Sequence, residues 1–243
     1  MRALIIADIH GNLEALDAVL AAAGPVDSVW CLGDVVGYGP DPNACLDRLR
    51  AQPDLVCVPG NHDWAAIGRI GTEDFNPEAR RATEWTAAQL SDEAKTYLGS
   101  LPLMVVREPF TITHGSPREP IWEYLTTAAG AAENFRYFST PACLVGHTHV
   151  PALFYQDPEQ RRVQARFMSD GEEIVVGPVR FIANPGGVGQ PRDQDPRAAY
   201  AIYDADRHVL TWHRVSYPVE VTQAKMRRAG LPERLAVRLA YGW

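Results

Sequence analysis

Two aspartates, one asparagine and four histidines of this chain lie in five short motifs whose residue types suit the binding of metal ions. In chain order the motifs are Asp8-Ile9-His10, Gly33-Asp34, Gly60-Asn61-His62-Asp63, His114-Gly115 and Gly146-His147-Thr148-His149. Mixed oxygen and imidazole ligands suit Mn, Fe, Zn or Ni, whereas Ca and Mg prefer oxygen alone. Seven candidate ligands exceed one tetrahedral ion. They suit two ions that share a carboxylate, which is the geometry of phosphoryl-transfer sites.

Each motif taken alone is a weak signal. A single histidine is usually a packed or surface residue, and an aspartate or asparagine at the end of a loop commonly caps a helix. All five motifs, however, directly follow an apolar run of the sequence. Chance does not explain that shared placement, so we interpret the motifs together as one site.

The apolar runs have the length and composition of buried β-strands. They read ALIIA, VWCL, LVCV, FTIT and ACLV. Helical segments alternate with the first of them, which predicts βαβ units and a sheet with parallel strands. Ligands bind beyond the carboxyl ends of such strands. We therefore expect five strands to deliver the motif residues to one rim.

Turn and capping signals predict where the helices and strands begin and end. Asn12 caps a helix over 13–23 that Gly24 closes, and Asp41-Pro42 opens a helix through Leu49. The segment 77–100 is also predicted to be helical, and its second part, SDEAKTYL, begins with a capping signal. After residue 150, short β-type runs separated by turns predict antiparallel structure.

The domain organisation is predicted to be one unit over 1–243, because no linker divides the chain. The five motifs lie within 8–149. A β-rich continuation spans 150–217, and a C-terminal helical segment spans 218–243, with a break at 230–232.

Composition narrows the functional classes. The 243 residues are 46% hydrophobic and 22% charged, as in an ordinary globular protein. Four cysteines without a CxxC pair argue against a Cys-rich zinc site. The net charge of −7 without a basic stripe argues against nucleic acid as a partner. The sequence lacks a signal-peptide pattern and an apolar stretch of membrane-spanning length, which predicts a cytoplasmic protein without a membrane partner.

The ordered motifs DxH, GD, GNH, H and GHxH resemble the signature of the calcineurin-like metallophosphoesterase superfamily. The stretches GDVVGYGPDPNAC, HGSPREPIWEYL and NPGGVGQPRD look like its compact prokaryotic phosphodiesterase-like members, which lack a cap domain. The resemblance implies a mixed α/β fold, often classed α+β. It is a four-layer α-β-β-α sandwich with two β-sheets.

The same resemblance implies the division of the ligands between two metal ions. The first ion would take Asp8, His10, Asp34 and His149. The second would take Asp34, Asn61, His114 and His147, with Asp34 as the bridge. His62 would be the catalytic histidine that binds no metal.

The expected activity is hydrolysis of phosphoesters, with diesters preferred. Two divalent ions, manganese expected and Fe, Ni or Zn as alternatives, would hold a bridging hydroxide nucleophile while His62 assists the leaving group. The stretch from Gly33 to Gly39 lacks the arginine of the GDxxxRG pattern. Its absence argues against phosphoprotein phosphatase and dinucleoside tetraphosphatase activity.

Several interpretations stay open at this point. Arg118 and Tyr38 are candidate substrate contacts, but either can have a structural role, with Arg118 paired to a surface acid. Asp63 either orients His62 or caps a helix. Rival functions are a phosphomonoesterase or nucleotide phosphatase, a nuclease, and a non-enzymatic metal-binding scaffold. We expect a small phosphoester as the partner, and homo-oligomerisation remains an open question.

Overall fold

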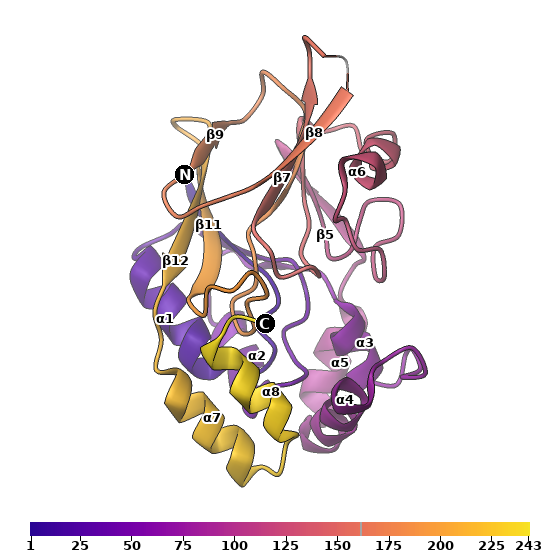
Figure 1. The fold of residues 1–243 in the computed structure, drawn as a ribbon, viewed down its shortest axis with the longest axis vertical. Helices are drawn as coiled ribbons and strands as arrows, with labels where there is room; N and C mark the ends of the chain where they lie inside the picture. Colours follow the sequence, from indigo (N-terminus) through magenta and orange to yellow (C-terminus); the bar gives the residue numbers. More distant parts are fainter. Residues whose placement is uncertain (161) are drawn as a thin grey trace.

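The computed structural model describes residues 1–160 and 162–243, which form two six-stranded sheets. The sheets pack face to face, with α1 (Leu13–Ala23) and α2 (Pro42–Arg50) on one side and α6 (Ala128–Asn134) on the other (Figure 1). Helices α7 (Val219–Arg228) and α8 (Glu233–Val237) lie at one end. This arrangement confirms the predicted four-layer α-β-β-α sandwich.

The first sheet has the strand order β3-β2-β1-β11-β12-β9. Its strands in that order are Val56–Cys57, Ser28–Cys31, Arg2–Ile6, Ala198–Asp204, Val209–Val215 and Glu173–Val175. The pairs β1–β2 and β2–β3 are parallel, whereas β1–β11, β11–β12 and β12–β9 are antiparallel.

The second sheet has the strand order β4-β5-β6-β10-β7-β8. Its strands in that order are Met104–Arg107, Phe110–Thr113, Ala142–Leu144, Phe181–Asn184, Ala152–Asp157 and Arg162–Phe167. Here β5–β6 and β6–β10 are parallel and the remaining pairs are antiparallel. Strand β8 was not predicted from the sequence.

Alternation along β1 shows how the layers form. Ala3 and Ile5 join the core between the two sheets, together with Trp30 and Phe110. Successive strand residues point to opposite faces, so Leu4 instead joins the core beneath the helices. Full burial of a large aliphatic side chain stabilises the fold by about 1.5–3 kcal/mol.

The helices are α1 Leu13–Ala23, α2 Pro42–Arg50, α3 Asn61–Ala66, α4 Pro77–Gln89, α5 Asp92–Ser100, α6 Ala128–Asn134, α7 Val219–Arg228, α8 Glu233–Val237 and the 3₁₀ turn η1 Arg238–Ala240. The predicted cap of α1 is confirmed, because Asn12 Oδ1 accepts a hydrogen bond from the Ala15 N–H at 3.1 Å. Gly24 ends this helix with φ +65°.

The helical prediction over 77–100 is confirmed, including the capping signal at the start of SDEAKTYL. The segment forms α4 and α5, because Leu90 has extended backbone angles and the Ser91 side chain caps α5 by accepting from the Ala94 N–H. Helix α6 was not predicted. The break in the C-terminal segment is confirmed at Gly230, where φ is +70°. The single-domain organisation stays a prediction.

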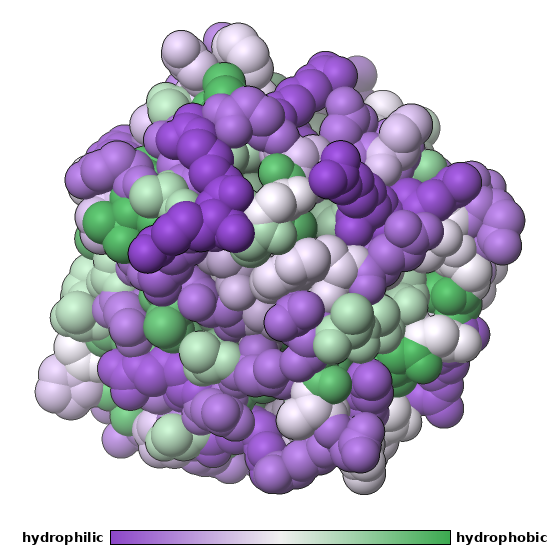
Figure 2. Space-filling model, turned by 90° about the horizontal axis from the view of Figure 1, so that it is seen from below, coloured by the Kyte–Doolittle hydropathy of each residue, from purple (hydrophilic) through white to green (hydrophobic). Residues whose placement is uncertain are grey.

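The surface seen from below the sheets is mostly hydrophilic, with hydrophobic residues in small separate groups (Figure 2), as on ordinary protein surfaces. In the described part of the chain, no helix combines the length and apolar character that crossing a membrane requires.

Candidate metal centre

The motif residues meet where the carboxyl ends of strands from both sheets approach each other. Strands β1, β2 and β3 belong to one sheet, and β5 and β6 belong to the other. Within each sheet hydrogen bonds join the strand ends, since the Asp8 N–H donates to Gly33 O at 3.0 Å and the Gly146 N–H donates to His114 O at 2.7 Å. Between the sheets, the His147 N–H donates to Asp8 Oδ1 at 3.2 Å. The rim predicted from the sequence is thus shared by two sheets.

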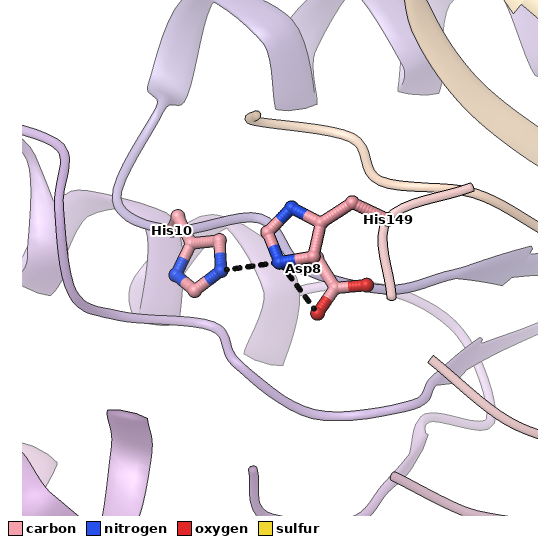
Figure 3. A group of neighbouring side chains, drawn as sticks. All are labelled: Asp8, His10 and His149. Carbon is pink, nitrogen blue, oxygen red and sulfur yellow. Dashed lines mark hydrogen bonds and ion pairs between the residues drawn. The ribbon is translucent and has the colours of Figure 1, made fainter. Parts of the chain in front are cut away.

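The first group of ligands contains Asp8, His10 and His149, all buried, with one ligand atom of each within 4.8 Å of the others. His10 Nε2 and His149 Nε2 lie 3.2 Å apart, and His149 Nε2 lies 3.5 Å from Asp8 Oδ1. Figure 3 shows the three side chains converging.

The second group contains Asp34, His114 and His147, which are also buried and equally close. His114 Nε2 lies 3.1 Å from His147 Nδ1 and 3.3 Å from Asn61 Oδ1. Asp34 connects the groups, because its Oδ2 lies 3.4 Å from His114 Nε2 and 3.6 Å from His10 Nε2. All seven predicted ligands are therefore brought together.

Backbone carbonyls orient the four histidines. The Nδ1–H groups of His10, His114 and His149 donate to Val36 O, Leu32 O and Gln190 O at 3.1, 2.7 and 2.6 Å. His147 lies the other way round, with Nε2 3.3 Å from Trp122 O. Because a carbonyl only accepts, the ring nitrogen that faces it carries the proton, and in a neutral imidazole the other ring nitrogen offers its lone pair to the centre.

The charges fit bound cations. Burial lowers the pKa of His10, His147 and His149 well below the ordinary value, so these imidazoles are neutral. Burial would raise the pKa of Asp34, but nearby histidines, His114 foremost, outweigh it and hold that pKa well below normal. In the same surroundings Asp34 raises the pKa of His114 to about 9, against the effect of burial.

Two buried carboxylate oxygens are unsatisfied. Asp8 Oδ2 and Asp34 Oδ2 lack a hydrogen-bond partner among the described residues, and a buried polar group without a partner costs free energy. Burial is the main cause that raises the pKa of Asp8 to about 7. Imidazoles beside unsatisfied carboxylate oxygens are a donor set that suits two metal ions.

The backbone at the ligands is unusual. Five of them have left-handed backbone angles, with φ of 56° at Asp8, 49° at His10, 53° at Asp34, 67° at His147 and 60° at His149. Such angles are uncommon outside glycine and cluster at functional sites.

His62 lies beside the ligands but is oriented differently from Asn61. Its backbone N–H donates to Asp34 Oδ1 at 2.9 Å, and its ring lies 4.9 Å from the ring of His10. Burial lowers the pKa of His62 to about 4. Its buried Nδ1 has no hydrogen-bond partner in the described structure.

The Asp63 side chain forms hydrogen bonds with the backbone. Gly60 is the N-cap of α3 and Asp63 is the third helical residue, which corrects the suggested N-cap role of Asp63. Its carboxylate accepts hydrogen bonds from the Gly60 N–H at 2.9 Å and the Val36 N–H at 3.0 Å. Each oxygen is thereby engaged by the backbone, so Asp63 fixes the loop around Asp34.

The two candidate substrate contacts differ in their surroundings. Tyr38 is buried, and its ring lies 4.7 Å from that of His10 and 4.4 Å from that of His62. Arg118 forms an ion pair with Glu123. Substrate contact by either residue stays a prediction.

Arg192 was missed by the sequence reasoning. Burial raises the pKa of Asp8, and the positive charge of Arg192 partly opposes that rise. Burial lowers the pKa of His149, and the same charge lowers it further. Its Nε is buried without a hydrogen-bond partner among the described residues, and its guanidinium lies 5.9 Å from the Tyr38 ring centre. Arg192 lies in the stretch NPGGVGQPRD, where an arginine in a glycine-rich loop after an apolar run was the available signal.

Comparisons with known proteins agree with this geometry. An uncharacterized protein of Methanocaldococcus jannaschii is 34% identical over 247 residues, covering 98% of this chain and 97% of that protein. A crystal structure of a metallophosphoesterase from Sphaerobacter thermophilus is 52% identical with a TM-score of 0.92, covering 100% of this chain and 99% of that one.

A more distant relative is a symmetrical bis(5'-nucleosyl)-tetraphosphatase of Erwinia tasmaniensis. It is 32% identical over 145 residues, which cover 55% of this chain and 50% of that enzyme. The family model of the calcineurin-like phosphoesterase superfamily domain matches residues 1–208. The chain therefore belongs to the calcineurin-like phosphoesterase superfamily.

Proposed function

We propose that this protein is a dinuclear metal-dependent phosphodiesterase in which Asp34 bridges the two ions. The observation that carries the proposal is the position of Asp34 Oδ2, 3.6 Å from His10 Nε2 of one ligand group and 3.4 Å from His114 Nε2 of the other. One carboxylate oxygen can thus serve both groups.

The proposed ligand sets follow from the two groups. Asp8, His10, Asp34 and His149 would hold one ion, and Asp34, Asn61, His114 and His147 would hold the other. When bound, two divalent ions supply an activated water and offset negative charge on the phosphoryl oxygens. Manganese is our proposal for the ion, with Fe, Ni or Zn as alternatives.

His62 is proposed to assist the leaving oxygen. Its buried Nδ1 has no hydrogen-bond partner in the described structure, and its ring stands beside His10. The peptide N–H of His62 also donates to Asp34 Oδ1 at 2.9 Å, so the carboxylate and the imidazole are held in one geometry. Such fixed geometry is what general acid catalysis requires.

Arg192 is proposed to bind the phosphoryl group. Its guanidinium lies beside Tyr38, and its Nη2–H donates to Gln190 Oε1 at 2.9 Å. The structure records no ion pair between Arg192 and a described acid, so its charge is open to an anion.

Metal analysis combined with a substrate pair tests the proposal. Protein reconstituted with Mn and then freed of excess metal should approach two equivalents, and it should hydrolyse bis(4-nitrophenyl) phosphate faster than 4-nitrophenyl phosphate. A plateau at one equivalent refutes the dinuclear site. Faster monoester turnover refutes the diester preference, and lack of turnover with Mn, Fe, Ni and Zn supports a non-enzymatic scaffold.

Single-stranded DNA belongs in the same panel. Cleavage of DNA at a higher kcat/KM than small diesters would favour a nuclease. The net charge of −7 leads us to expect the opposite result, because backbone phosphates repel an acidic surface.

A further inference from the structure

A cavity of about 280 Å³ lies beside the metal centre, and Asn61 and His62 form part of its wall. Much of the remaining wall is aromatic, with Tyr38, Phe75, Trp122 and Tyr124. His62 is therefore shared by the cavity and the centre. A group attached to a phosphate at the metals can extend past His62 into this space.

The aromatic rings form a connected wall. The Phe75 ring lies 4.6 Å from that of His62 and 5.7 Å from that of Trp122, in an edge arrangement with Trp122. Phe75 is buried, so this part of the wall is fixed by packing. An aromatic ligand entering the cavity meets ring edges and faces, which favour offset or edge-to-face contacts.

Tyr124 offers the exposed part of this wall. Its ring stacks on His147 at 3.7 Å between ring centres, yet 51% of the residue is exposed. Tyr124 lines the cavity and is half exposed, so a planar ligand can stack on its ring.

Two polar residues border the same cavity. Asp74 is exposed, so its carboxylate is open to a ligand as an acceptor. Asn76 Oδ1 accepts from the Ala79 N–H at 2.9 Å, which leaves the Asn76 amide N–H groups as donors. An acceptor beside a donor complements the adenine edge, which has an amino group next to a ring nitrogen.

We propose that this cavity binds the base of a nucleoside and that the substrate class is therefore nucleoside phosphodiesters. The nucleoside occupies the leaving side, because His62, which is proposed to assist the leaving oxygen, lines the cavity. This proposal rests on the proposed function, since it assumes that the phosphate lies on the metals. It adds recognition of the base, which catalysis at the metals does not require.

Two substrates that differ only in the base test the proposal. Adenosine 5'-(methyl phosphate) and ribose 5-(methyl phosphate) share the same diester, so the ratio of their kcat/KM values measures base recognition. We expect Tyr124→Ala to lower this ratio roughly 5- to 100-fold, the range found when base stacking is removed. Tyr124→Phe keeps the ring and should keep the ratio.

Tyr137→Ala is the matched control, because Tyr137 is 43% exposed and does not line the cavity. It should leave the ratio unchanged. Calorimetric titration with adenosine 5'-monophosphate and ribose 5-phosphate gives a second readout. The nucleotide should bind tighter to the wild-type protein, and Tyr124→Ala should remove the difference. Because Tyr124 stacks on His147, the metal content of every variant is also measured. A variant that keeps its metal ions but loses the ratio has lost base recognition and not a ligand.

The outcomes separate the two proposals. Equal hydrolysis of both esters by the wild-type protein, or an unchanged ratio in Tyr124→Ala, overturns the base site while the phosphodiesterase stands. If neither ester is hydrolysed and bis(4-nitrophenyl) phosphate is not hydrolysed either, the proposed function fails, and the titrations then test the base site on their own. Tighter nucleotide binding that depends on Tyr124 then supports the base site, and equal binding of both phosphates overturns it.

Discussion

Gly60→Ala is a steric test of the bridging position of Asp34. A Cβ added at Gly60 would lie 2.0 Å from Asp34 Oδ1 and 2.6 Å from the Asp34 backbone nitrogen. The backbone at Gly60, with φ −105° and ψ 179°, is accessible to alanine. The substitution therefore strains the contact with Asp34 while leaving the local backbone conformation acceptable.

The distances set the size of the effect. Ordinary van der Waals contact begins at 3.4 Å, so the bridging carboxylate must move by more than an ångström from its 2.0 Å clash. A displacement of about 1 Å at a catalytic group can cost on the order of 100-fold in rate. Overpacking of this kind typically destabilises a fold by about 1–3 kcal/mol. We expect the loss of activity to be much larger than the loss of folded protein that this destabilisation causes.

The assay combines metal analysis, diester hydrolysis and thermal unfolding. Gly60→Ala should stay folded, bind fewer than two Mn equivalents and lose activity. Gly99→Ala is the control, because its added Cβ meets only Ile67 Cδ1 at 3.8 Å, and in helix α5 alanine is favoured over glycine by about 0.5–1 kcal/mol. Two bound equivalents with wild-type activity in Gly60→Ala would refute our placement of Asp34.

Three further predictions concern single side chains. Asp34→Asn should lower metal content at both ligand groups, whereas Asp8→Asn should affect one, and equal stoichiometry in the two variants would contradict the bridge. His62→Ala should keep both metals and lose about 10²–10⁴-fold with alkyl diesters but clearly less with nitrophenyl diesters. An equal loss with both would assign His62 to phosphate binding. Arg192→Ala should lower kcat/KM about 10- to 100-fold, the value of a hydrogen bond to a charged group. Arg192→Lys should recover part of the lost kcat/KM. Wild-type kinetics in Arg192→Ala would show that Arg192 does not bind the substrate.

The predicted ligands were accessible to sequence reasoning because each signal is local. Asp8, Asp34 and His114 come two, three and one residues after the ends of β1, β2 and β5. The candidate ligands are therefore adjacent in the sequence to the apolar patterns that predict the strands. The order of the motifs then indicated the family, and the resemblance to the family implied a fold with two sheets.

The missed features depend on contacts between distant segments. Arg192 reaches Tyr38 only because the loop after β10 folds over the centre. Phe75 meets His62 and Trp122 from the loop before α4, where no periodic pattern marks it as part of a wall. The ion pair of Arg118 with Glu123 likewise depends on a turn that residue types alone do not specify.

The left-handed backbone of the ligands affects how this protein should respond to directed evolution. Each of Asp8, His10, Asp34, His147 and His149 holds a φ between 49° and 67°, and such strain costs a non-glycine residue on the order of 1–3 kcal/mol. Glycine at these positions would relax the metal-free chain while deleting a ligand. Selection for heat resistance in a chelating medium should therefore enrich inactive glycine variants. The same selection in metal-rich medium should retain the ligands, because bound ions stabilise only the folded chain that keeps them.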